Sequence, residues 1–189
     1  MLDSAVAVPT RGRVLLAIAR ASVAEALSVR QLAVACDEPW LLEPGATFVT
    51  LRRRGRLRGC VGSLYAHRPL CEDVRSNARS AAFHDTRFPP VRREEYPELG
   101  FEVSLLSTPE LLDCGGEEEA LARLRPGTDG VIFDCEGCRS TFLPQVWEHL
   151  ADPREFLGQL KLKAGLPAAF WSPDVRLWRY SVSKWEEED

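Results

Sequence analysis

The stretch EPGATFVTLRRRGRLRGCVGSL, residues 43–64, decides the fold that we expect for this chain. Its segment Thr47–Leu51 is rich in β-branched and aromatic residues, a composition that favours a strand. Gly55 marks a turn, and residues 57–64 form the return strand. The stretch therefore predicts a β-hairpin with a run of arginines near its tip.

The segments on either side of the hairpin follow helical and extended patterns in turn. Apolar residues at helical spacing predict helices over 14–36, 70–83, 117–124 and 153–165. Alternating patterns predict a strand over 99–107, a second hairpin over 130–144 that turns at Glu136-Gly137, and a final strand over 175–185. Since the order has no regular βαβ rhythm, we expect an α+β fold of antiparallel sheets with flanking helices.

Length and composition indicate an ordinary globular protein. The chain has 189 residues, of which 45% are hydrophobic and 28% charged, and this length favours one domain. We expect that domain over residues 13–185, between a flexible N-terminus, 1–12, and a solvated acidic tail, 186–189. Its apolar runs are far shorter than the ~20 residues of a membrane span, and a secretory-signal layout is absent. The expected location is the cytoplasm, without membrane association.

Charge and cysteine usage narrow the possible partners. The formal net charge is −4, so the arginine run RRRGRLR is expected to be solvated surface, and nucleic-acid binding is unlikely. The six cysteines are expected to be thiols in a reducing cytoplasm. Cys135 and Cys138 form a C-x-x-C without a second ligand pair, which favours two cross-strand cysteines over a metal site. No metal and no cofactor are expected.

The motif LRGCVG, residues 57–62, is the candidate functional centre. In an extended strand, Arg58, Cys60 and Gly62 lie on one face, while Leu57, Gly59 and Val61 lie on the other, toward the core. Arg58 would lie ~6.5–7 Å along the strand from Cys60, where a guanidinium favours the reactive thiolate. Gly62 would leave space beside the sulfur, and Gly59 would admit a neighbouring backbone or a ligand. The alternative is a buried strand in which the cysteine only packs.

A polar face on the strand 99–107 supplies a candidate base. Glu102 and Ser104 point away from the apolar residues Phe101 and Val103. Glu102 could act as a general base for Cys60, or it could simply pair with an arginine. Ser104 is a candidate hydrogen-bond donor on the same face.

The segment AAFHDTRFPP offers a second candidate base. His84 with Cys60 would make a nucleophile–base pair, and Asp85 would orient the histidine. A histidine near the end of a helix is also favoured by the helix dipole alone. Asp85 and Arg87 are expected to pin the turn through a salt bridge.

Together these segments resemble one known family. The motifs GATFVTLRRRGRLRGCVGSL, AAFHDTRFPPV, FEVSLLSTPELL, GTDGVIF, TFLPQVW and KAGLP, in this order, are similar to the AMMECR domain family, whose microbial members are called AmmeMemoRadiSam system protein A. The resemblance covers the chain from about residue 20 to the final strand. It implies an α+β fold with two lobes of unequal size and a cleft between them. The family's LRGCIG-type motif, which is regarded as its functional centre, matches residues 57–62, with Val61 in place of isoleucine.

The resemblance supports a site more than a reaction. The system name implies association with Memo-like and radical SAM proteins. One hypothesis is an enzyme component that uses the cysteine on a small-molecule or protein substrate; the other is a non-catalytic partner module. The candidate catalytic residues are Cys60, Arg58, Glu102 and His84, and the candidate binding residues are Gly59, Gly62, Ser104, Asp85 and Arg87.

Overall fold

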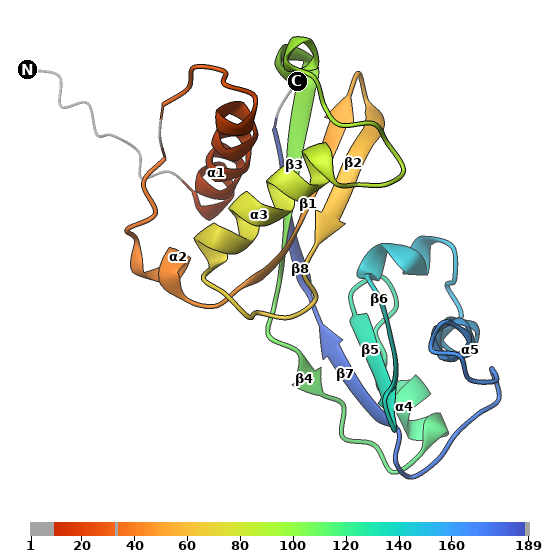
Figure 1. The fold of residues 1–189 in the computed structure, drawn as a ribbon. Coiled ribbons are helices and arrows are strands. Elements are labelled where there is room, and N and C mark those ends of the chain that lie inside the picture. Colours follow the sequence, from red (N-terminus) through yellow and green to blue (C-terminus); the bar gives the residue numbers. More distant parts are fainter. Residues whose placement is uncertain (1–9, 33, 188–189) are drawn as a thin grey trace, which may run out of the picture. The chain divides into compact units, whose positions relative to one another are not determined.

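The computed structural model describes residues 10–32 and 34–187 (Figure 1). The chain divides into two compact units. The first unit comprises Met1–Leu106 and Ser183–Asp189, and the second comprises Ser107–Val182. No helix in the described ranges is long and apolar enough to cross a membrane. The predicted cleft between two lobes stays a prediction.

The first unit contains a four-stranded sheet in the order β2-β1-β3-β8. Its strands are β1 (Ala46–Arg53), β2 (Arg56–Gly62), β3 (Leu99–Leu106) and β8 (Val182–Glu186), and its helical segments are α1 (Arg11–Ala26), α2 (Pro39–Leu42), α3 (Leu70–Phe83) and the 3₁₀ helix η1 (Arg93–Glu98). The strand β1 pairs antiparallel with both β2 and β3. Helix α3 packs against β1 and β2, and α1 packs against α3 and β3 (Figure 1).

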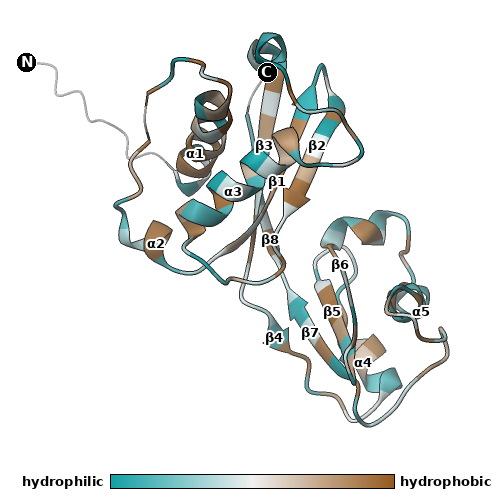
Figure 2. Ribbon diagram, in the orientation of Figure 1, coloured by the Kyte–Doolittle hydropathy of each residue, from teal (hydrophilic) through white to brown (hydrophobic). Residues whose placement is uncertain are grey.

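The core of the first unit lies between its helices and one face of its sheet. Val49, Leu51, Phe101 and Val103 are fully buried or nearly so, and they share one apolar cluster with residues of α1 and α3. Figure 2 shows both helices carrying hydrophobic and hydrophilic residues. This is the pattern of helices with one buried and one solvated side.

The second unit has its own sheet and core. Its sheet runs in the order β4-β7-β5-β6, with β4 (Glu110–Leu111), β5 (Gly130–Cys135), β6 (Cys138–Phe142) and β7 (Arg176–Tyr180), and it also contains α4 (Glu117–Arg123), η2 (Pro144–Glu148) and α5 (Pro153–Lys163). Trp147 stacks on Phe156, with ring centroids 3.7 Å apart. Lys161 is completely buried, and its ammonium is held by Glu117 at 2.7 Å. Asp129 is also completely buried and pairs with Arg125 at 2.6 Å, so the apolar centre of the unit contains paired internal charges of both signs.

The predicted α+β class, with antiparallel pairing and flanking helices, is confirmed. Both hairpins are present, and the predicted helix over 70–83 coincides with α3. The hairpin turn at Glu136-Gly137 has positive φ at both residues and sets Cys135 opposite Cys138, as expected for cross-strand cysteines.

Two predicted elements have different boundaries. The first helix ends at Ala26 instead of continuing to Cys36, because Ser28 takes up a left-handed conformation (φ 54°) that stops it. The segment expected as one final strand is two strands, β7 and β8, which belong to different sheets. The strand pairing is interrupted at Ser181, between the end of β7 at Tyr180 and the start of β8 at Val182.

One prediction about the chain's chemistry is corrected, and the ends of the chain are described in part. Cys36 and Cys71 are joined in a disulfide with Cα atoms 6.1 Å apart, so the expectation of six thiols is wrong for this pair. Of the predicted flexible N-terminus, residues 1–9 lie outside the described residues, whereas Arg11 begins α1. In the predicted tail, Glu187 is not simply solvated, because its carboxylate accepts a hydrogen bond from Arg20 Nε at 2.6 Å.

Candidate functional site

The candidate site lies on the face of the first unit's sheet that is turned away from α3. The helix side is identified by Gly59, where an added Cβ would lie 2.0 Å from the carbonyl oxygen of Ala81 in α3. Since side chains alternate along a strand, the neighbouring Cys60 points to the opposite side. We call this side the far face and define it by six residues that the register aligns in two rows: Cys60–Thr50–Glu102 and Gly62–Phe48–Ser104.

Cys60 is held by three separate residues. Its backbone N–H donates to Asp85 Oδ2 at 2.9 Å, and its carbonyl accepts from Arg87 Nη2 at 3.2 Å. The hydroxyl of Thr50, directly opposite on β1, donates to the Cys60 sulfur at 3.3 Å. Because β2 is an edge strand, Asp85 and Arg87 satisfy backbone groups of Cys60 that a further strand would otherwise pair.

A β-bulge changes the predicted role of Arg58. Leu51 pairs with Gly59 but Arg52 pairs with Leu57, so Arg58 has no partner residue on β1. A bulge re-aims the extra side chain. Arg58 donates from Nε and Nη2 to the two carboxylate oxygens of Glu95, at 3.0 and 3.1 Å. The strict alternation expected through Arg58 is therefore wrong, and Arg87 is the arginine that contacts Cys60. Leu57 changes sides for the same reason and is 39% exposed instead of facing the core.

Both glycines of the motif make room for protein atoms. A Cβ on Gly62 would lie 2.3 Å from the ring of Phe48, so the space expected there for a ligand is filled by that ring. At Gly59 the close neighbour is the backbone of α3, one of the two alternatives that the sequence left open. The glycines thus bring β2 close to α3 on one side and to Phe48 on the other.

Glu102 is a buried carboxylate at the end of the Cys60 row. It is 6% exposed, and its Oε2 lies 2.9 Å from Lys184 Nζ and 3.6 Å from Arg52 Nη2. It also lines a hollow of about 480 Å³, together with Arg52, Arg54, Gly55, Glu98, Gly100, Phe101, Glu186 and Glu187. The alternative pairing with an arginine is observed, and a lysine from β8 strengthens it.

The other sequence-predicted residues divide into two groups. Ser104 lies on the far face, one row from Cys60, and is buried. Asp85 and Arg87 form the expected salt bridge at 2.7 Å. His84 is exposed, and it borders a different surface hollow with Arg75 and Arg79. The structure therefore brings Asp85 to Cys60 but does not bring the imidazole of His84 there.

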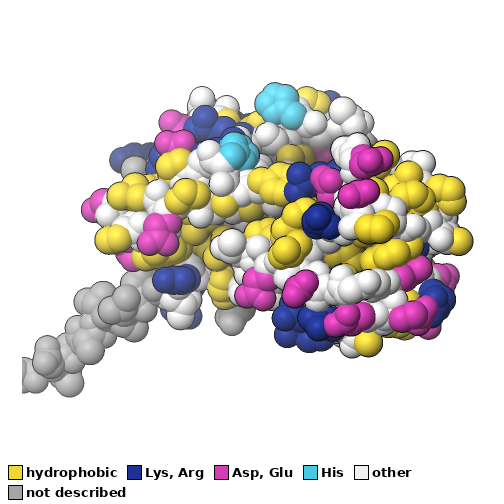
Figure 3. Space-filling view, turned by 90° about the horizontal axis from the view of Figure 1, so that it is seen from below, with side chains coloured by type: hydrophobic (Ala, Val, Ile, Leu, Met, Phe, Trp, Pro, Cys, Tyr) yellow, Lys and Arg dark blue, Asp and Glu magenta, His cyan; other side chains and the backbone are white. Residues whose placement is uncertain are grey.

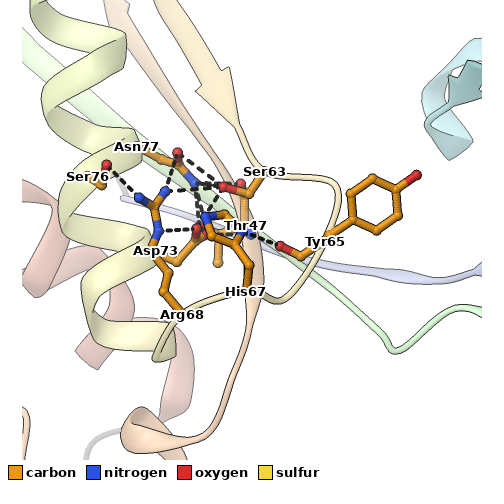
Figure 4. Close-up of polar contacts among 8 residues, drawn as sticks. All are labelled: Thr47, Ser63, Tyr65, His67, Arg68, Asp73, Ser76 and Asn77. Atoms are coloured by element: carbon orange, nitrogen blue, oxygen red, sulfur yellow. Dashed lines mark hydrogen bonds and ion pairs between the residues drawn. The ribbon is translucent and has the colours of Figure 1, made fainter.

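A buried polar network fixes the chain where it leaves β2 (Figure 4). Asp73 is completely buried, and its carboxylate accepts hydrogen bonds from Thr47, Ser63, Arg68 and Asn77. Arg68 reaches over from the loop that follows β2, and Ser63 directly follows Gly62. The network therefore joins α3, β1 and the end of the LRGCVG strand.

Sequence reasoning missed Thr50, Lys184 and the Asp73 network. Thr50 could not be placed opposite Cys60 from the hairpin alone, because an unbroken register from the turn at Arg54-Gly55 pairs it with Gly59 instead. The bulge at Arg58 supplies the shift by one residue. Asp73 gave a weak signal, as a carboxylate one position from apolar residues on the buried side of a predicted helix.

Hydrogen bonds from arginines lower the pKa values of two carboxylates around the site. Hydrogen bonds from Arg87, then from the Cys60 amide, hold the pKa of the Asp85 carboxyl well below its usual range despite burial, which acts the other way. Arg58 lowers the pKa of Glu95 to about 2 in the same manner. Asp85 in turn raises the pKa of Arg87, to which Cys60 contributes a smaller effect. Both carboxylates are therefore ionised at neutral pH.

Within residues 10–32 and 34–187, no group of three or more His, Cys, Asp or Glu side chains could hold a metal ion. Figure 3 shows one face of the molecule, where Lys and Arg side chains are interspersed with acidic and hydrophobic ones rather than gathered into a basic surface.

The fold and the site define a class: an α+β protein with a half-buried cysteine on the side of an antiparallel sheet that is turned away from α3. Residues 16–185 match the family model described as AMMECR1, so the chain belongs to the AMMECR1 family.

Similar proteins come from archaea. A protein of Methanothermobacter thermautotrophicus is 36% identical over 181 residues, covering 94% of each chain. Protein PF1979 of Pyrococcus furiosus is 36% identical and covers 94% of this chain and 88% of its own. The crystal structure of the uncharacterized protein PH0010 from Pyrococcus horikoshii is similar with a TM-score of 0.79 and 35% identity, covering 94% of this chain and 91% of that one.

Proposed function

We propose that this protein uses Cys60 as a nucleophilic thiol toward a small or protein-bound substrate. The observation that carries the proposal is the set of contacts at Cys60, whose amide, carbonyl and sulfur are each held by a different side chain. The thiolate is the nucleophilic form of cysteine. The Thr50 hydroxyl donates to this sulfur, and the Arg87 guanidinium donates to the carbonyl of the same residue.

Glu102 is the proposed proton acceptor. It lies opposite Thr50, which lies opposite Cys60, so the three residues form one row on the far face. As the sulfur forms a bond to an electrophilic carbon, the bond from that carbon to its leaving group breaks and the leaving group departs with the electron pair. The thiol proton passes to the carboxylate of Glu102, which is paired with Lys184. Arg58 and Asp85 are positioning residues, since they hold the strand and not the substrate. His84 has no part in this proposal.

The proposed setting follows from the family. The family's system name supports a role in the cytoplasm beside Memo-like and radical SAM proteins, as one component of a modification system. The far face, as part of the first unit's sheet, is then the surface that meets the substrate.

Site-resolved alkylation tests the proposal. With iodoacetamide at pH 7, followed by peptide mapping, Cys60 is expected to react faster than Cys138 and Cys114. Burial raises the pKa of the Cys114 thiol, so Cys114 serves as a slow internal control. Thr50→Val, which removes the hydroxyl donor and keeps the side-chain shape, should slow Cys60 several-fold.

Two results would count against the thiol proposal. One is a Cys60 that reacts no faster than Cys138. The other is a Cys60→Ser variant that unfolds with several kcal/mol less stability, because a polar substitution at a packing cysteine has that effect. A well-folded Cys60→Ser protein that is no longer labelled at this position supports the proposal.

A non-catalytic partner module is the second candidate function. It is favoured by the two glycines, whose space is taken by Phe48 and by α3, so that the strand presents a filled surface. In that case Cys60→Ser should leave the affinity for a purified Memo-like protein unchanged, as measured by calorimetry. Substituting Thr50 and Glu102 by arginine should abolish it.

A further inference from the structure

Arg87 presents an unused pair of donors next to the Cys60 strand. Its Nε and Nη2 donate to the carboxylate of Asp85 at 2.9 and 2.7 Å, and Nη2 also donates to the Cys60 carbonyl. Within the described part of the chain, neither N–H group of Nη1 has a hydrogen-bond acceptor. A guanidinium has five N–H donors in a fixed plane, so the contacts that anchor one side aim the other.

The Arg87–Asp85 ion pair has its positive end exposed to solvent and its negative end buried. The Asp85 side chain is 6% exposed and the Arg87 side chain is 55% exposed, so the negative end is buried and the positive end faces solvent. The Asp85 carboxylate is already occupied by the amides of Cys60 and Arg87 and by the guanidinium. An approaching solute therefore meets the cation and not the carboxylate.

The cation is held firmly in place. The guanidinium lies over the ring of Phe88, 5.6 Å from its centroid, and two prolines follow that residue. Glu95 takes Nε and Nη2 of the bulge residue Arg58, and the Nη1 of Arg58 also has no hydrogen-bond acceptor among the described residues. That Nη1 is buried, however, and the Arg58 side chain is only 11% exposed. Arg87 is thus the arginine next to Cys60 whose unused donors face solvent.

We propose that the Cys60 site takes a substrate with a carboxylate group close to its electrophilic carbon, and that Arg87 binds this carboxylate through Nη1. This inference rests on the proposed function, because it names the substrate class for the same thiol. Arginine suits the role, since its charge is permanent and its planar donors match carboxylate oxygens.

A pair of alkylating reagents tests carboxylate recognition by Arg87 separately from the reactivity of the Cys60 thiol. Iodoacetate and iodoacetamide both form a sulfur–carbon bond, release iodide and leave the thiol proton to the buffer, but only iodoacetate carries a carboxylate. The measured quantity is the ratio of the two rate constants at Cys60, divided by the same ratio for the neutral thiol N-acetylcysteine amide. Peptide mapping assigns the label to Cys60 in the full chain.

The expected ratio is above one, and it should decrease about fivefold in Arg87→Gln, the effect of one unit charge near the reagent in water. Arg87→Lys should retain most of the preference for iodoacetate, because lysine keeps the positive charge. Arg56→Gln is the matched control, because Arg56 is an exposed arginine on the same strand, and it should leave the ratio unchanged. In 0.5 M salt the ratio for the wild-type protein should also decrease toward one, because salt screens the charge of Arg87. Loss of mere structural support would slow both reagents together and leave the ratio as it was.

Each result has a distinct meaning. A reactive Cys60 whose ratio equals that of the free thiol, or is the same in Arg87→Gln, overturns carboxylate recognition and leaves the thiol proposal standing. A Cys60 that reacts with neither reagent in the folded protein overturns both.

Discussion

Asp73 does not contact Cys60, but it fixes the path of the chain that follows the Cys60 strand. Its carboxylate has no exposed surface, yet donors from β1, from α3 and from the loop after β2 converge on it. A buried charge is tolerated only when its hydrogen bonds are complete. The path of the chain beyond Gly62, and so the end of the Cys60 strand, depends on this one residue.

Replacing Asp73 should therefore be costly. We expect Asp73→Ala to reduce the free energy of unfolding by about 3–5 kcal/mol, because it leaves Arg68 and several neutral donors without an acceptor. Glu72→Gln is the matched control, since Glu72 is the exposed neighbour on the same helix and should change stability by less than about 0.5 kcal/mol. Urea denaturation measures both, and equal effects would show that the network is dispensable.

At the scale of elements, the close approach of β2 to α3 sets the plane of the far face. Gly59 permits that approach, and the bulge next to it turns Arg58 toward η1. Helix α3 was predictable from its periodic apolar face and from the two prolines of RFPPV, which end the helical pattern. The β-bulge at Arg58 was not predictable, because the residues around it have no distinguishing composition. Its location depends on the ion pair that Arg58 forms with Glu95 in η1.

Gly59→Ala tests the close approach directly. The added methyl group would meet the backbone oxygen of Ala81, which cannot rotate away, so we expect a loss of about 1–3 kcal/mol in unfolding free energy. Gly100→Ala is the control, because nothing lies within 4 Å of a Cβ at that position. Both variants are compared by chemical denaturation, and a neutral Gly59→Ala would contradict the packing described for β2.

The ion pair between β2 and η1 predicts a dependence on acid. The pKa of Glu95 is about 2 in the folded protein and near 4.5 in the unfolded chain, so the folded state binds fewer protons. Its stabilising effect is complete above about pH 5 and disappears as the pH decreases toward 2, with an upper bound of about 3 kcal/mol. Glu95→Gln should flatten this part of the stability profile, and an unchanged slope in urea titrations at pH 5, 4 and 3 would contradict it.

At the scale of the whole molecule, the sequence pattern predicted the fold class and most of the helices and strands. It did not predict how the strands are divided between the two sheets. Residues 175–185 alternate as one strand does, and the alternation gives no sign that β7 and β8 belong to different sheets. The Cys36–Cys71 pairing was equally hidden, because it needs the irregular segment after Ala26 to return to the first turn of α3. Both are long-range contacts, which local patterns do not encode.

The disulfide should make stability depend on redox conditions. It closes a loop between residues 35 positions apart, and the chain-entropy model assigns about 4 kcal/mol to such a loop. We expect thermal denaturation to occur several degrees lower in dithiothreitol than without it. Cys36→Ser should melt at the lower temperature in both buffers. A wild-type protein whose melting temperature is the same with and without dithiothreitol would contradict a stabilising contribution of the disulfide.

The position of the second unit between β3 and β8 has a consequence for synthesis. As the polypeptide leaves the ribosome, three strands of the first sheet are complete while β3 still has an open edge, and the whole second unit must be made before β8 arrives to cover it. Lys184 and Glu187 come with that late strand, so the partners of Glu102 and Arg20 are supplied last. A nascent chain would thus carry Cys60 on a sheet whose proposed acid–base partner is still without its lysine.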